Sequence, residues 1–197
     1  KQGNAVVPSP VICCLGRMSD YRQVLYPYLR EPNLQLIVVG DARAEFAGTQ
    51  CGEWISNAST TPAPSIQIDQ ELAQNAYVHE LISKEWVSHC HDISSGGLWM
   101  CLTEMILGER GLAKVGCSID LGEGDAWTRL FAENGGYLLA VPTQHLDQVL
   151  KKGKEQKITV SVMGQTQDDL RVSVSSSSDS FSFTVDQLSE WFNSRNA

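Results

Sequence analysis

The sequence predicts an α/β fold, namely a three-layer α/β/α sandwich with a mixed sheet. Short apolar or alternating segments typical of strands are interleaved along the whole chain with amphipathic segments typical of helices. Clusters of glycine, proline, serine and asparagine separate these segments. With 197 residues, of which 42% are hydrophobic and 19% charged, the chain has the length and composition of a globular domain with a sizeable core.

The first third of the chain is expected to contain two strands and one short helix. Residues 11–15 and 34–39 are short apolar segments of the kind that form strands. Between them, Ser19 or Asp20 is placed to cap a brief helix that Pro27 interrupts.

Residues 41–65 are expected to form a connection, because they are rich in glycine, serine, threonine and proline. Asp69 then caps a predicted helix that continues to about Lys84. The predicted core face of this helix consists of Leu72, Ala73, Ala76, Tyr77 and Leu81.

The second half of the chain continues the alternation. Asp125 is expected to cap a short helix, and Thr143 a longer one that Gly153 ends. Residues 186–192 are expected to form a last amphipathic helix. Strands are expected at residues 115–121, 137–141, 158–162, 170–174 and around Phe181 and Phe183.

The most informative stretch is a strand, a tight turn and a helix between residues 86 and 107. Residues 86–91 are typical of a short strand. The helix after the turn presents one apolar face, formed by Leu98, Cys101, Leu102, Met105 and Ile106.

The turn itself is the sequence His91-Asp-Ile-Ser-Ser-Gly-Gly97. Asp92, Ser94 and Ser95 are suitable N-cap residues, and Gly96 and Gly97 let another group approach the backbone closely. Unpaired amides at a helix start suit a phosphate, a carboxylate or a neighbouring acidic loop. The alternative is plain helix capping without a ligand, which any such turn requires.

The charge balance disfavours two classes of partner. The net charge is −8, and the 15 lysines and arginines form no stripe, so neither nucleic acid nor an anionic membrane is expected as a partner. No apolar run approaches the roughly 20 residues that span a bilayer, and the start at Lys1 lacks the apolar region of a signal peptide. These features predict a cytoplasmic protein.

The cysteines and histidines predict neither a disulfide framework nor a metal site. The six cysteines form no CxxC pair, which is typical of reduced thiols. The run from His89 to Asp92 resembles a metal cluster, but in a strand Cys90 points away from His89 and His91. In a cytoplasmic protein, the glycosylation sequon at residues 57–59 would be a chance match.

Several segments resemble one family in order along the chain. Residues 91–98 followed by Thr103-Glu-Met105 resemble the H-D-[IV]-S-D-G-G-L…A-E-M signature of the formylglycinamide ribonucleotide amidotransferase family, also called phosphoribosylformylglycinamidine synthase. Four further segments resemble its P-T-P-x-I, L-G-x-T-x-x-E-L-G-G-S-E, L-F-S-E-S and V-I-G-x-V motifs, namely residues 8–12, 40–50, 130–134 and 162–166.

This resemblance implies the last domain of the synthase, of the type shared with aminoimidazole ribonucleotide synthetase. Residues 1–16 would be a linker or strand from a preceding ATP-binding domain, and residues 17–197 the domain itself. Three other members of the superfamily carry different sequences at the central turn: thiamine monophosphate kinase, the hydrogenase-maturation protein and selenophosphate synthetase.

The implied activity is an ATP-dependent ligase that converts formylglycinamide ribonucleotide to the amidine with ammonia from glutamine. The ATP and Mg²⁺ ligands and the catalytic histidine would lie in other domains, so this chain would hold no cofactor, metal or catalytic residue and would be inactive alone. Its implied partners are the N-terminal ATP-binding domains and a glutaminase subunit or domain. The residues implied in substrate or phosphate binding are Asp92, Ser94, Ser95, Gly96, Gly97 and Glu133.

Five departures from the family pattern favour a less active cleft beside this domain. Ser95 replaces an aspartate, Ala47 a glycine, Thr49 a serine and Gln50 a glutamate, and the basic residue expected after Glu133 is missing. One alternative is therefore a structural or interaction domain without catalysis. A more distant alternative is a small hydrolase that uses the Cys90 thiol, for which the flanking histidines are poorly placed.

Overall fold

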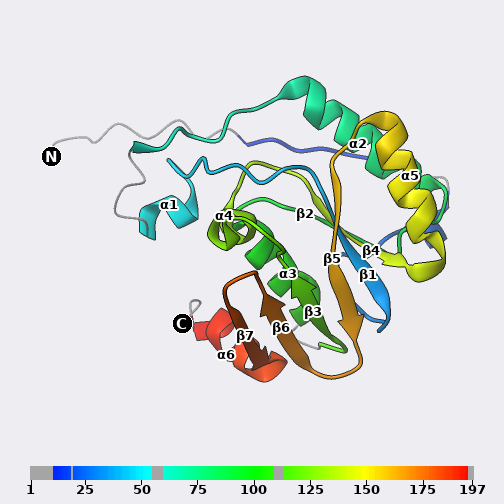
Figure 1. The fold of residues 1–197 in the computed structure, drawn as a ribbon. Helices are drawn as coiled ribbons and strands as arrows, with labels where there is room; N and C mark the ends of the chain where they lie inside the picture. The colour runs from blue at the N-terminus through cyan, green and yellow to red at the C-terminus, as the bar shows by residue number, and fades with distance from the viewer. Residues whose placement is uncertain (1–10, 19, 55–59, 109–112, 195–197) are drawn as a thin grey trace, which may run out of the picture.

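The computed structural model describes residues 11–18, 20–54, 60–108 and 113–194, and its centre is a seven-stranded sheet flanked by helices (Figure 1). The strands are β1 (Leu34–Val39), β2 (His89–Asp92), β3 (Gly116–Asp120), β4 (Tyr137–Pro142), β5 (Val160–Gln167), β6 (Arg171–Ser175) and β7 (Ser180–Thr184). The helices are α1 (Gln50–Trp54), α2 (Ile68–Ser83), α3 (Gly97–Leu107), α4 (Ala126–Phe131), α5 (Leu146–Gln156) and α6 (Val185–Ser194), with 3-10 turns at Tyr21–Gln23 and Thr143–His145.

The sheet is mixed, as the sequence predicts. Its strand order is β2-β4-β1-β5-β3-β6-β7. Strand β1 pairs antiparallel with both β4 and β5, whereas β3 and β6 pair in parallel. The chain therefore crosses the sheet several times, which brings loops that are distant in sequence to the same end of the sheet.

Alternation along the strands divides the core into two layers. In β1, Ile37 and Val39 pack on the side of α2 and α5, whereas Leu36 packs on the side of α3 and α6. Strand β4 divides in the same way, with Leu139 on the first side and Leu138 on the second. Helices thus cover both faces, and the three-layer α/β/α prediction is confirmed (Figure 1).

The N-terminal half differs from the sequence prediction in two places. Residues 11–15 form no strand, and their apolar side chains are exposed. The short helix α1 lies within the expected connection, because the buried Thr49 hydroxyl accepts a hydrogen bond from Gly52 N at 2.9 Å and so caps its first turn. Of the two proposed caps near residue 20, Asp20 caps the 3-10 turn, and Ser19 lies outside the described residues, as does the sequon at 57–59.

Two helices also differ from their predicted ends and faces. The N-cap of α2 is Gln67 rather than Asp69, and Leu72 is 62% exposed while Gln74 and Val78 face the core. Helix α5 continues through Gly153, because the missing side chain makes room for Val160 on the adjoining strand. The hydrophobic periodicity predicts both helices, but it does not determine which face of each helix packs against the sheet.

We expect Asp125→Ala to destabilise the fold by about 1 kcal/mol through loss of an N-cap. The Asp125 carboxylate accepts hydrogen bonds from Trp127 N at 3.2 Å and Thr128 N at 3.1 Å. Hydrogen bonds from Thr128, its side chain first, and from Trp127 lower the pKa of Asp125 below its usual 3.8.

The lowered pKa of Asp125 fixes the pH range of this effect. Its contribution is present above the unfolded-state pKa and is lost as the pH falls through the lower folded-state pKa. Urea unfolding at pH 7 and near pH 3 measures it: the difference between the wild-type chain and Asp125→Ala should shrink at the lower pH. An equal difference at both values would contradict this assignment.

Candidate functional site

The junction between β2 and α3 is a turn in which two glycines adopt left-handed backbone conformations. Gly96 has φ 80° and is the N-cap of α3, and Gly97 has φ 67°. No side chain caps this helix, so the prediction that Asp92, Ser94 or Ser95 would do so is wrong. The three side chains are exposed instead, because the left-handed turn at Gly96 and Gly97 directs the helix start toward another part of the chain.

That other part is the turn between α4 and β4. The Gly96 amide donates a hydrogen bond to Glu133 Oε1 at 2.8 Å. The same oxygen accepts a hydrogen bond from the Gln50 amide, at the start of α1, at 2.9 Å. A carboxylate of the chain itself therefore lies at the helix start that the sequence predicts to suit an anion.

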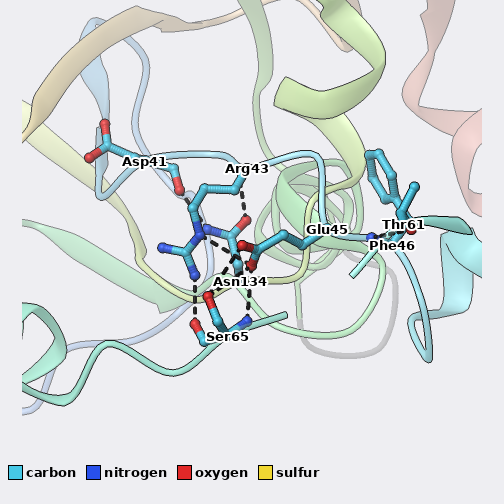
Figure 2. Close-up of polar contacts among 7 residues, drawn as sticks. All are labelled: Asp41, Arg43, Glu45, Phe46, Thr61, Ser65 and Asn134. Atoms are coloured by element: carbon cyan, nitrogen blue, oxygen red, sulfur yellow. Dashed lines mark hydrogen bonds and ion pairs between the residues drawn. The ribbon is translucent and has the colours of Figure 1, made fainter. Parts of the chain in front are cut away.

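Asn134, the next residue, holds a second loop. Its side chain accepts a hydrogen bond from Arg43 N at 3.0 Å and donates one to the Asp41 carbonyl at 2.6 Å (Figure 2). The Arg43 side chain pairs with Glu45 at 3.2 Å and donates to the Ser65 carbonyl at 2.7 Å. These contacts fix the loop after β1 against the turn that carries Glu133.

Three of the segments that carry the family resemblance thus meet at one place, which we call the loop hub. It consists of residues 41–50, 92–97 and 133–134. Of the candidate residues, Gly96 and Glu133 are in direct contact. Gly97 packs against the backbone of Leu130 and Phe131. A Cβ atom at Gly97 would lie 2.6 Å from the Leu130 carbonyl oxygen.

Two cavities adjoin the loop hub. One, of about 360 Å³, lies between α1, α3, α4 and α6 and is lined mainly by aromatic side chains. The other, of about 170 Å³, is lined by Gly40 to Ala42 together with Leu98, Arg129 and Ser161. Arg129 is the candidate that sequence reasoning missed, and its only signal was its position directly before the motif at residues 130–134.

The arrangement favours anion binding over metal binding. Among the described residues, no group of three or more histidine, cysteine, aspartate or glutamate side chains is placed to hold a metal ion. Glu133 already accepts two amide hydrogen bonds, so it is poorly suited to a magnesium ligand. The residues present therefore do not fit a resident Mg²⁺. The charged residues that line the second cavity are Asp41 and the half-buried Arg129.

The histidines and cysteine of β2 do not form a catalytic pair. His89 is buried with Nδ1 at 3.2 Å from the Tyr26 carbonyl, and burial lowers its pKa. His91 lies on the side of α3, with Nε2 at 3.3 Å from Glu104. Burial raises the pKa of the Cys90 thiol to about 12, so the thiolate that a hydrolase would need is disfavoured.

Alkylation of the native chain tests this reading of Cys90. With iodoacetamide near pH 8, we expect the exposed Cys13 and Cys14 to react, and Cys90 to react roughly a thousandfold more slowly than in the urea-unfolded chain. Peptide mass spectrometry locates the modified thiols. Labelling of Cys90 in the native chain as fast as Cys13 would restore the hydrolase hypothesis.

The seven-stranded mixed sheet and its two helical layers define a three-layer α/β domain. The family model for AIR synthase related protein, C-terminal domain, matches residues 31–176, and the chain belongs to this family. In the described residues no helix has the length and apolar character needed to cross a membrane.

Solved structures show the same fold at low sequence identity. PurL from Thermotoga maritima in complex with FGAR superimposes with a TM-score of 0.70 at 15% identity, over 85% of this chain and 30% of that one. Phosphoribosylformylglycinamidine synthase II from the same organism gives 0.69 at 14% identity, over 85% and 28%. A HypE–HypF complex gives 0.52 at 16% identity, over 80% and 54%. The chain therefore spans less than a third of the PurL chains.

Proposed function

We propose that this chain is the C-terminal domain of a phosphoribosylformylglycinamidine synthase. The intact enzyme would convert formylglycinamide ribonucleotide, ATP and glutamine-derived ammonia to the amidine in the cytoplasm. The observation that supports this most is the loop hub, because three segments chosen for their resemblance to the synthase, far apart in sequence, contact one another through Glu133 and Asn134. Family membership supports the same class of enzyme.

In this proposal the chain contributes a wall of a composite cleft rather than the reacting groups. Residues 1–16 would connect it to an ATP-binding domain, and residues 17–197 would form the wall. ATP with Mg²⁺, held by other domains, would activate the formamide oxygen by phosphoryl transfer before ammonia displaces it. The partners would be those ATP-binding domains and a glutaminase subunit or domain.

Arg129 is the residue of the chain that we expect to contact substrate. Glu133 occupies the amide of Gly96, so a phosphate reaching that helix start would have to displace a carboxylate. The second cavity is instead lined by Arg129 and Ser161 together with Gly40, Asp41 and Ala42 of the loop after β1. A guanidinium and a hydroxyl are suitable donors for a phosphate group.

Expression of the complete open reading frame in a purine-requiring bacterium without its own synthase tests the proposal. Growth without added purine is expected for the wild-type gene. In the purified enzyme, Arg129→Ala should raise KM for the phosphorylated substrate about tenfold with little change in kcat. Arg171→Ala, at an exposed arginine on β6, is the matched control. Absence of growth with a well-expressed wild-type protein would overturn the proposed activity.

A structural domain without ligand contacts is the second candidate. The observation in its favour is that Glu133 of the chain itself already satisfies the helix-start amide considered for an anion. Titration of the isotope-labelled chain with inorganic phosphate or ADP separates the two candidates. Shifts of the Ser161 and Arg129 signals favour the cleft wall. If these signals do not shift, even when the titration is repeated with the intact enzyme, the structural domain is favoured.

A further inference from the structure

A groove of about 360 Å³ opens beside the loop hub, and its walls come from α1, α3, α4 and α6. We call it the aromatic groove and define it by Trp54, Trp99, Met100, Trp127, Phe131 and Trp191. Four of the five tryptophans of the chain lie in it, and the fifth is Trp86. This concentration separates the groove from the singly scattered apolar side chains that every protein surface carries.

The walls of the aromatic groove are both exposed and held in place. Trp54 is 77% exposed, Trp191 53% and Trp127 45%. Neighbouring rings support Trp127 and Trp191, since the Trp127 and Phe131 ring centroids lie 4.5 Å apart and those of Trp191 and Phe183 lie 5.2 Å apart. The groove is therefore a preformed apolar surface that remains in contact with water in this chain.

Charge around the groove limits what could cover it. Within the described residues, these four helices and the N-cap Asp125 carry five exposed carboxylates and one basic residue, Arg129. The carboxylates are Glu53, Glu104, Asp125, Asp186 and Glu190. A second copy would bring the same acidic helices and a net charge of −8 to the contact. Like charges oppose that contact, whereas a cationic partner would be attracted.

We propose that the aromatic groove is a docking site for a positively charged polypeptide segment of a partner protein, which inserts large apolar side chains between α1 and α6. The volume is sufficient for two such side chains, and tryptophans are the residues that most often dominate binding energy at interfaces. Lysine or arginine beside those side chains would meet the carboxylates of α1 and α6. This inference does not depend on the proposed ligase activity.

Binding of two synthetic peptides to the full chain tests the docking site. Both carry leucine and phenylalanine at i, i+3, i+4 and i+7, and the other positions are lysine in one peptide and glutamate in the other. We expect the lysine peptide to bind at least about tenfold more tightly, less so at high salt, and to shift the indole signals of the groove tryptophans.

Variants distinguish the apolar from the charged part of the site. Trp54→Ala should weaken binding of the lysine peptide about tenfold, with Trp191→Ala as a second variant if the first is unstable. Glu53→Lys combined with Glu190→Lys should weaken it about tenfold, whereas Glu155→Lys on α5 should leave it unchanged. Equal binding of the two peptides, unshifted indoles, or a dimer of the chain that Trp54→Ala abolishes would overturn the proposal.

Discussion

Gly97→Ala is expected to destabilise the chain by about 3 kcal/mol or more, the largest effect of any methyl-sized change at the loop hub. Gly97 has φ +67°, a conformation that side chains other than glycine adopt at a cost. An added Cβ would also lie 2.6 Å from the Leu130 carbonyl oxygen and 2.8 Å from the Phe131 backbone. The obstacle is backbone, so a rotamer change cannot relieve it, and α3 would have to move away from α4.

Gly48→Ala is the matched control for this prediction. Gly48 has φ +78°, but no atom lies within 4 Å of the position that its Cβ would take. Only the backbone cost of about 1 kcal/mol is then expected. Urea unfolding of both variants gives the comparison, and equal losses would contradict the close approach at Gly97.

Glu133→Ala is expected to lower the free energy of unfolding by about 2–3 kcal/mol, although Glu133 lies in a turn. One carboxylate oxygen accepts hydrogen bonds from Gly96 N and Gln50 N, at 2.8 and 2.9 Å. Removal leaves two helix-start amides without this acceptor, and water replaces only part of the interaction because Gly96 is partly buried. Urea unfolding at neutral pH measures the loss.

Glu133→Gln and Glu123→Ala serve as comparisons. Glutamine keeps an acceptor oxygen but loses the charge, so about half of the loss is expected. Glu123 is exposed in the loop before α4, and its truncation should change stability by less than about 0.5 kcal/mol. If Glu133→Ala were as mild as Glu123→Ala, the two hydrogen bonds would not hold the loops together in solution.

Local patterns predicted the layers of this fold more reliably than its contacts. Strand β1 agrees with its apolar segment at residues 34–39, and Asp125 caps α4 as expected, because each depends on neighbours in sequence. The buried face of α2 differs from the one that its hydrophobic pattern predicts, because Gln74 packs against Gly40 at the end of β1. Long-range packing therefore overrode the hydrophobic pattern in that helix.

In the candidate site too, local features could be predicted from the sequence and long-range contacts could not. The resemblance identified the segments of the loop hub, and Gly96 and Gly97 were expected to admit a close neighbour. The sequence did not reveal that these neighbours are Glu133 and the backbone at Leu130. Glu133 lies 37 residues from Gly96 along the chain. Ser94 and Ser95 have the chemistry of capping residues, yet neither caps α3. The Gly96 amide donates instead to the Glu133 carboxylate from another turn.

Hydrogen exchange at two amides tests the loop hub most directly. In the wild-type chain, the Gly96 and Gln50 amides should exchange with solvent more slowly than other amides at helix starts, because both donate to Glu133. In Glu133→Ala, which removes the acceptor, both should exchange at least about tenfold faster, while amides of β1 stay unchanged. If only one amide, or neither, responds to the substitution, Glu133 does not join these loops and the account of the site is wrong.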